Sequence, residues 1–154
     1  MDQKVTVFVN ARFLTQELTG VQRYAFECCL QMKKLIPDLV LLRPAKSPQQ
    51  HWCESLQAVP IGFFSGHIWE QIDLPLYLRN KPGAILLNLC NTAPCFIRHQ
   101  YFTLHDLSFL YFPENHSVLF RLWYRFLIPI IVKRAKHIFT VSETVKEQIQ
   151  HQYA

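Results

Sequence analysis

Short apolar runs rich in β-branched residues alternate with longer stretches of helical spacing along the whole chain. Nearly continuous apolar runs are typical of strands that a parallel sheet covers on both faces. The predicted strands cover 4–10, 38–43, 84–89, 100–104 and 137–141, and the ambiguous region 51–65 offers one further short strand near 56–59. The alternation predicts an α/β fold with a doubly wound, mainly parallel sheet flanked by helices.

Capping residues and prolines mark the ends of the predicted helices. Thr19 and Gln22 have the spacing of a capping box at the start of the first helix. Pro75 is expected to break or kink the second helix. Ser117 and Ser142 are the expected N-caps of the last two helices. These helices cover 19–35, 68–78, 118–135 and the residues that follow 142.

The composition favours one folded domain with a basic surface. The chain has 154 residues, half of them hydrophobic, which is enough to bury a core and excludes disorder. Its net charge of +5 suits a polyanionic partner, such as a nucleotide diphosphate, a nucleic acid or an anionic membrane surface. We expect no nucleic-acid partner, because the chain has no basic run and no recognised nucleic-acid-binding module.

The cysteines predict neither a metal site nor a disulfide framework. The five are Cys28, Cys29, Cys53, Cys90 and Cys95. They include no C-x-x-C pair and no Cys/His spacing that suits zinc. We interpret them as reduced, mostly buried thiols of a cytoplasmic protein. The first ten residues have no apolar stretch before a small-residue cleavage site, so we expect no signal peptide.

Two strand ends carry residues that could do chemistry. His105 and Asp106 follow the strand 100–104, and ligands of parallel sheets collect beyond the carboxyl ends of strands. Gly20 begins the helix after the first strand, where backbone N–H groups and the helix dipole could hold a phosphate. The alternatives stay open: Gly20 could be a simple turn glycine, and Asp106 could cap neighbouring N–H groups.

The apolar segment 118–135 is too short to cross a bilayer and contains Arg121, Arg125 and Pro129. We therefore expect no transmembrane role. Either the segment packs in the core or against a second domain, or its aromatic and basic residues make a peripheral membrane contact.

Six short strings, taken in order, cover nearly the whole chain. They are NARFL (10–14), LTGVQRY (18–24), GHIWEQ through LP (66–75), LNLCNTAP (87–94), HDLSF with FPE (105–114) and TVSE (140–143). Together they resemble the amino-terminal half of family 4 glycosyltransferases, which are retaining enzymes of the GT-B fold. The middle strings are similar to the branch of bacterial polysaccharide mannosyltransferases.

The resemblance implies two Rossmann-like domains that face each other across a cleft. The amino-terminal domain mainly receives the acceptor, a glycan or lipid-linked saccharide, and the carboxy-terminal domain holds the nucleotide-sugar. By this resemblance Gly20 approaches the donor diphosphate and His105 contacts the transferred sugar. Asp106 is expected to orient the loop or the histidine rather than to act as a base. The nucleotide-sugar is a co-substrate, and no cofactor or metal is expected.

Four further residues are second-rank candidates for substrate binding, each with a structural role as its alternative. They are Arg12, Arg23, Glu70 and Asn91, all on strand-end loops or helix starts. Arg23, for example, could instead pair with Glu27 one turn further along the helix.

Residues 1–154 are expected to form only the acceptor-side domain, because the second domain with its E-x7-E motif is absent. The expected function is half of an enzyme that moves a hexose, mannose being one candidate, to a surface polysaccharide or glycolipid. Such a half would be inactive without its missing carboxy-terminal partner. The alternative is a non-catalytic remnant or a peripheral membrane or partner-binding module. Both readings predict a cytoplasmic location, with a peripheral contact at the inner membrane as an option.

Overall fold

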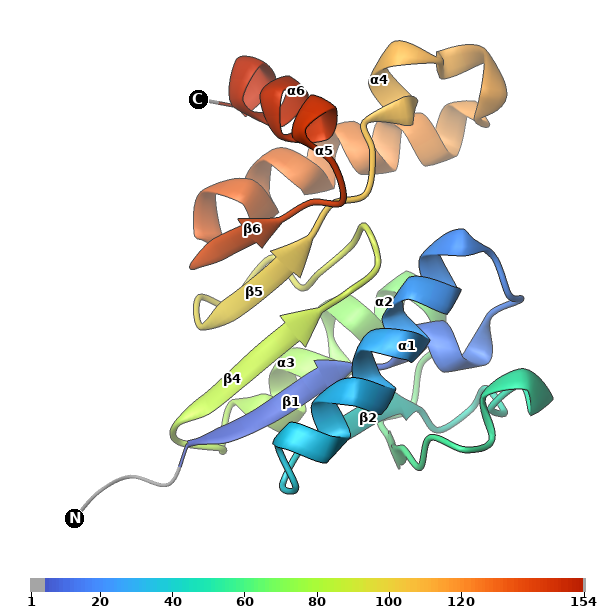
Figure 1. Ribbon diagram of the computed structural model, residues 1–154, viewed down its shortest axis with the longest axis vertical. Coiled ribbons are helices and arrows are strands. Elements are labelled where there is room, and N and C mark those ends of the chain that lie inside the picture. Colours follow the sequence, from blue (N-terminus) through green and yellow to red (C-terminus); the bar gives the residue numbers. More distant parts are fainter. Residues whose placement is uncertain (1–4, 154) are drawn as a thin grey trace.

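A computed structural model describes residues 5–153 and shows six parallel strands in one sheet (Figure 1). The strands are β1 (Thr6–Asn10), β2 (Val40–Pro44), β3 (Val59–Ile61), β4 (Ala84–Asn88), β5 (Gln100–Thr103) and β6 (His137–Phe139). Their order in the sheet is β3-β2-β1-β4-β5-β6, and every neighbouring pair is parallel. The predicted α/β fold is confirmed, and the sheet is Rossmann-like and doubly wound.

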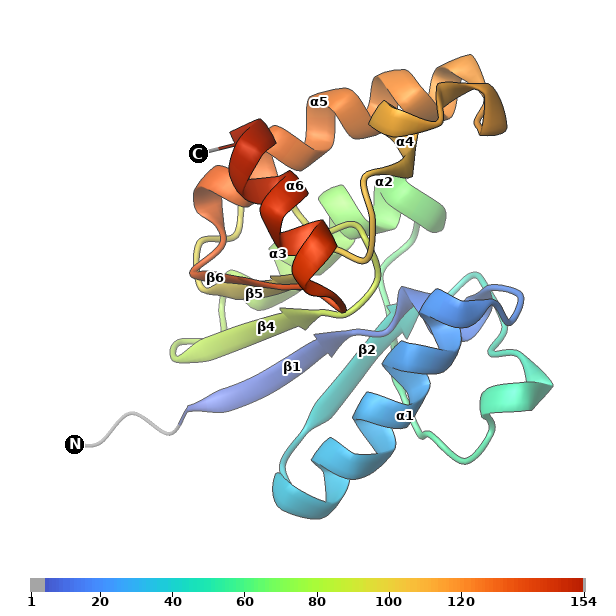
Figure 2. The same ribbon diagram turned by 45° about the horizontal axis from the view of Figure 1, so that its top comes forward.

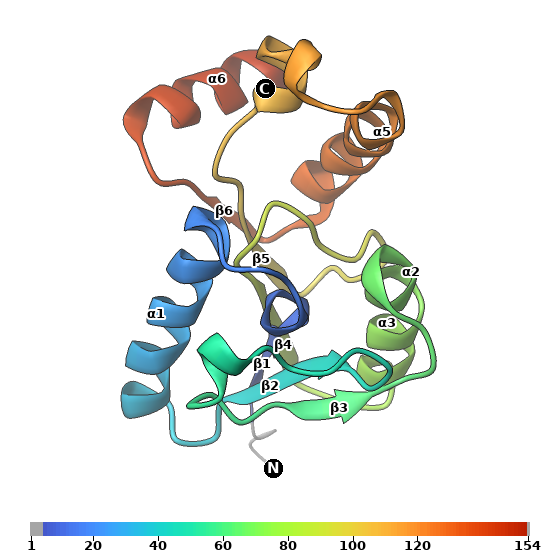
Figure 3. The same cartoon turned by 90° about the vertical axis from the view of Figure 1, so that its right-hand side faces the viewer.

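Helices cover both faces of the sheet (Figure 3). They are α1 (Gly20–Leu35), α2 (Gly66–Gln71), α3 (Asp73–Leu78), α4 (Ser108–Tyr111), α5 (Val118–Arg134) and α6 (Glu143–Tyr153), with 3-10 turns at Arg12–Thr15, His51–Cys53 and Pro113–Asn115. Helices α1 and α6 lie on one face, and α2, α3 and α5 lie on the other. Helices α4, α5 and α6 gather at the β5–β6 end of the sheet (Figure 2).

Alternate side chains of the strands fill the two faces. In β1, Val9 packs with the α1 side of the core, whereas Phe8 packs with Trp69 and Leu74 from α2 and α3. A third cluster joins Phe102 of β5 to α5 and α6. This alternation is why the strands read as continuous apolar runs: both faces are buried.

The second predicted helix is two helices, and the break lies before Pro75 rather than at it. Helix α2 ends at Gln71 and α3 begins at Asp73. Pro75 has no N–H to donate to the Gln71 carbonyl, so α2 cannot continue, but Pro75 is tolerated in the first turn of α3. Asp73 fixes the break, because its Oδ2 accepts hydrogen bonds from the N–H groups of Phe63 and Phe64 at 2.9 and 2.7 Å.

The predicted caps have mixed outcomes. Ser117 and Ser142 accept the expected bonds from the N–H groups of Phe120 and Val145, both at 3.2 Å. Thr19 is the N-cap of α1, but its hydroxyl contacts the Gln22 side chain instead of a backbone N–H. The capping-box prediction is therefore wrong in its hydrogen bonding, and the first N–H groups of α1 receive no side-chain cap.

Other expected bounds move by a few residues. The strand expected near 56–59 lies at Val59–Ile61, and the last strand ends at Phe139.

All five cysteines are free thiols, and burial raises the pKa of Cys29 to about 12. Over residues 5–153, no helix has the length and apolar character needed to cross a bilayer.

Gly62 controls the turn between β3 and α2, and its substitution should destabilise the fold. Its φ is +78°, and a Cβ at this position would overlap the Asp73 side chain. We expect Gly62→Ala to lower the free energy of unfolding by about 2 kcal/mol or more in urea titrations. Gly20→Ala is the matched control, since a Cβ there meets nothing within 4 Å. Equal stability of the two variants would contradict this account of the turn.

Candidate functional site

The strand order reverses direction between β1 and β4, and the candidate residues collect where these strands end. The chain leaves β1 towards α1 on one face, while β4 and β5 are followed by loops at the same edge. In open parallel sheets this switch point leaves a crevice beyond the carboxyl ends of the strands. The loops 89–92 and 104–106 meet there.

His105 is held in a defined orientation at this edge. Its backbone N–H donates to Asn91 Oδ1 at 2.7 Å, and its ring Nε2 lies 2.8 Å from the carbonyl oxygen of Leu89. A carbonyl oxygen only accepts, so Nε2 carries the proton in this bond. The Tyr24 ring packs edge to face against the imidazole, with centroids 4.7 Å apart. None of the residues that the structure describes forms a hydrogen bond with Nδ1, so in the neutral imidazole this nitrogen is free to accept one.

Asn91 supports His105 from an unusual backbone conformation. Its φ of 38° lies in the left-handed region, which asparagine tolerates better than most residues. This conformation places the Asn91 amide oxygen under the His105 N–H. Asn91 therefore joins the loop after β4 to the loop after β5.

Asp106 begins the turn into α4. Its Oδ1 accepts a hydrogen bond from the N–H of Ser108 at 2.8 Å. This is the capping geometry of an Asx turn. Asp106 thus orients the loop that carries His105.

The first turn of α1 lies at the same edge as His105. Tyr24, which contacts the His105 ring, is one turn beyond Gly20. Cys90, in the loop after β4, places its Sγ 3.8 Å from the Val21 carbonyl oxygen. Gly20 itself is exposed, and the space where its Cβ would stand is open. The structure therefore brings Gly20, Asn91 and His105 to one side of the sheet.

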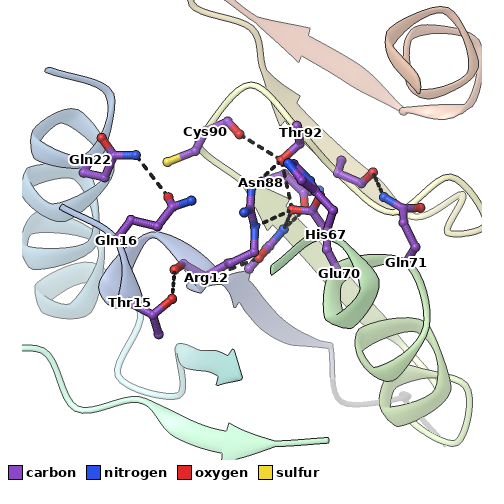
Figure 4. A network of polar contacts seen from close by, with 12 residues as sticks. Arg12, Thr15, Gln16, Gln22, His67, Glu70, Gln71, Asn88, Cys90 and Thr92 are labelled. Atoms are coloured by element: carbon purple, nitrogen blue, oxygen red, sulfur yellow. Dashed lines mark hydrogen bonds and ion pairs between the residues drawn. The ribbon is translucent and has the colours of Figure 1, made fainter. Parts of the chain in front are cut away.

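Arg12 and Glu70 lie below this edge in a buried polar network (Figure 4). The Arg12 Nε lies 3.4 Å from Glu70 Oε2, and Arg12 Nη2 donates to Thr92 Oγ1 at 3.0 Å. The Thr92 hydroxyl and the Asn10 amide donate to Glu70 Oε2 at 3.0 and 2.8 Å. Asn10 also donates to Asn88 Oδ1 at 3.1 Å. The network ties the ends of β1 and β4 to α2.

Glu70 is an ionised carboxylate in a fully buried position. Burial by itself raises the pKa of its carboxyl, but the Arg12 guanidinium, His67 and the Asn10 amide outweigh burial and leave the pKa below its ordinary value. The second oxygen, Oε1, lies 3.5 Å from His67 Nδ1. Arg12 and Glu70 therefore satisfy each other's charge and support the edge from beneath.

Arg23 follows Gly20 by one helical turn on α1, but its side chain lines a hollow that contains none of the other candidates. It is exposed on α1 and lines a small hollow of about 80 Å³ together with Leu18, Phe26 and Trp52. Over residues 5–153, no ion pair joins Arg23 to Glu27, so the pairing considered from the sequence is absent.

The described part of the chain also contains no group of three His, Cys, Asp or Glu side chains that could hold a metal ion.

The sequence does not mark several residues of the site as candidates. They are Tyr24, Gln71, Asn88, Thr92 and Gln100. Asn88 Nδ2 donates to Gln100 Oε1 at 3.0 Å, and Gln71 bonds the backbone of the loop after β4 at Ala93 and Cys95. The one signal for Asn88 and Gln100 is a polar residue at the end of an apolar run, where an unpaired amide would be costly.

The chain is similar to the O-antigen chain mannosyltransferase RfbU of Salmonella typhimurium strain LT2. The two are 32% identical over 94 residues, which is 61% of this chain. The aligned part spans a quarter of the relative's length. No family model matches the chain, and no solved structure matches it. The similarity and the Rossmann-like sheet together fit a glycosyltransferase.

Glu70→Gln should destabilise the protein strongly, because it leaves the buried Arg12 charge without its counter-ion. We expect a loss of about 3–5 kcal/mol in the free energy of unfolding at neutral pH, measured by urea titration. The double variant Arg12→Met/Glu70→Met is the control, since it removes both charges and should lose much less.

Glu70→Gln should also change how the free energy of unfolding depends on pH at acidic pH. The folded-state pKa of Glu70 lies below the ordinary 4.5, so its ionised form stabilises the protein above that pH. This contribution is lost as the pH falls through the lowered folded-state pKa. Stability profiles that run parallel for the wild-type and Glu70→Gln proteins below pH 5 would contradict the ion-pair assignment.

Proposed function

We propose that this chain is the acceptor-side domain of a family 4 glycosyltransferase of the GT-B fold. It would take part in moving a hexose, with mannose as first candidate, from a nucleotide-sugar to a surface polysaccharide or a lipid-linked glycan. The donor would be held by a second Rossmann-like domain, on the same or on a separate polypeptide. The similarity to an O-antigen chain mannosyltransferase supports the class of reaction.

The observation that carries the proposal is the fixed imidazole of His105 at the switch point of the sheet. Glycosyl transfer passes through an oxocarbenium-like state in which the hydroxyl groups of the sugar must be held in place. The Nε2–H of His105 is bonded to Leu89, so Nδ1 is left to accept a hydrogen bond from a sugar hydroxyl. A hydrogen bond of this kind lowers the barrier when it strengthens in the transition state.

The start of α1 supplies the complementary element for the departing nucleoside diphosphate. The first backbone N–H groups receive no side-chain cap from Thr19, and the helix dipole favours negative charge there. Gly20 leaves room for a phosphate to approach the backbone. Negative charge that develops on the leaving group would therefore be stabilised near His105.

The other candidates have supporting roles in this proposal. Asn91 and Asp106 orient the loop of His105, and Arg12 with Glu70 anchors the strand ends. Arg23 has no role in this proposal, because its side chain lines the hollow beside Trp52, which none of the other candidates lines. No metal ion takes part in the proposed reaction.

A partner-binding module is the second candidate function. A groove of about 580 Å³ between α2 and α5 is lined mostly by apolar side chains, including Ile68, Ile72, Leu119 and Trp123. Exposed apolar grooves of this kind mark contact surfaces in many proteins. This reading would be preferred if the chain, supplied with a donor-binding domain, shows neither transfer nor nucleotide binding.

His105→Ala should impair transfer without unfolding the domain. In a sugar-transfer assay of the chain completed by a donor-binding domain, we expect kcat to fall about a hundredfold, because a directed hydrogen bond in the transition state is lost. The thermal midpoint should change little, since His105 is only half-buried. The control is His51→Ala, which removes a fully exposed histidine whose ring contacts Glu54. A turnover equal to that of the control would refute the role of His105.

Gly20→Val should weaken the binding of the nucleoside diphosphate. The added side chain enters open space, so the fold is retained, but it occupies the approach to the first turn of α1. In calorimetric titrations of the completed enzyme with a panel of nucleoside diphosphates and nucleotide-sugars, we expect affinity to fall about tenfold, or 1.4 kcal/mol. Unchanged affinity would place the diphosphate elsewhere.

A further inference from the structure

Figure 1 shows that β5 and β6 begin at the edge of the sheet opposite to the one where they end. A basic hollow lies beside the first residues of these strands, whereas His105 follows the end of β5. Its volume is about 410 Å³, and its lining consists of Arg98, Lys133, Arg134, Ala135 and Lys136. All four basic side chains are exposed. They come from two segments, the loop before β5 and the end of α5 with the link to β6, so the fold brings together charges that are distant in the sequence.

Backbone contacts hold this hollow in shape. Arg134 Nη1 donates to the Cys95 carbonyl oxygen at 3.0 Å, and its guanidinium lies over the Phe96 ring at 5.6 Å from the centroid. The N–H of Lys136 donates to the Gln100 carbonyl oxygen at 2.8 Å. The two basic segments are therefore fixed to each other. Less conformational entropy is lost when an anion binds between them, because these segments are already ordered.

Within the described residues, the charges of this hollow have no acidic partner. Among residues 5–153, none of the ion pairs includes Arg98, Lys133, Arg134 or Lys136. The sequence has no Asp or Glu between Asp73 and Asp106, and none between Glu114 and Glu143. The two segments that form the hollow therefore contribute no acidic side chain that would repel an incoming anion.

The dipole of α5 accounts for only part of the cluster. Lys133 and Arg134 stand in the last turn, where the helix end favours cations. Arg98 and Lys136 lie outside the helix, so its dipole does not explain why they share the same hollow. An anionic ligand would be stabilised by all four groups.

We propose that this hollow is a second anion site, which binds a phosphate-bearing group such as a diphosphate or a phosphate monoester. Several oxygens on one group can accept from several cations together, and arginine suits phosphate through paired N–H donors. The group is either free in solution or the headgroup of an anionic lipid. This site is separate from the proposed diphosphate position at Gly20 and does not depend on the proposed glycosyl transfer.

To test for a free ligand, inorganic pyrophosphate is titrated into the 154-residue chain at low ionic strength, and binding is measured by calorimetry. We expect the variant Lys133→Gln/Lys136→Gln to bind it about tenfold more weakly than the wild type. The matched control is Lys46→Gln/Arg125→Gln, which removes the same charge from exposed positions elsewhere and should change affinity about twofold at most. Gly20→Val should retain binding at the hollow, which separates this site from the start of α1.

Vesicles of phosphatidylglycerol are the probe for a lipid headgroup, tested by co-sedimentation with the same variants. Vesicle binding that the Lys133→Gln/Lys136→Gln variant loses and the control retains would support the site and identify its source as the membrane. Binding of pyrophosphate with the same pattern would support the site and identify a free ligand. The proposal is overturned if the wild-type chain binds neither probe, or if both charge-reduced variants lose binding equally.

Discussion

The buried ion pair between Arg12 and Glu70 is the interaction on which the arrangement of the candidate site depends. Two opposite charges in a dry interior must stay together, because either alone would pay a large desolvation cost. The pair therefore fixes the segment after β1 against α2. Thr92 bonds to both partners, which fixes the loop after β4 as well. Asn91 directly precedes Thr92, and its amide oxygen accepts the hydrogen bond from the His105 N–H that fixes the loop after β5.

The architecture could be predicted from the sequence because the signal for it is local. A strand buried on both faces must be apolar along its length, and each of 4–10, 84–89 and 100–104 shows this without reference to the others. The sequence predicts the break in the helical segment 68–78 at Pro75, because proline lacks the N–H that a continuing helix needs. Its true position depends on Asp73, whose partners Phe63 and Phe64 belong to a different turn.

The candidate site was predictable only in outline. Strand ends locate Gly20 and His105, because parallel strands deliver their carboxyl ends to one edge. The sequence could not separate Arg12 and Glu70, which pair with each other, from residues that face a ligand. Their partnership joins distant positions and leaves no periodic signal. The proton on His105 Nε2 likewise depends on the Leu89 carbonyl oxygen. Because every residue has a backbone carbonyl, the sequence does not show which one the imidazole contacts.

The two outermost strands have a consequence for how copies of this protein can meet. β3 and β6 are three residues long, and β3 contains Pro60, which has no N–H to offer. Each border of the sheet therefore offers few backbone groups for hydrogen bonds with a strand of a neighbouring molecule. The borders of the sheet therefore favour assembly through side-chain surfaces over extension by adding strand to strand.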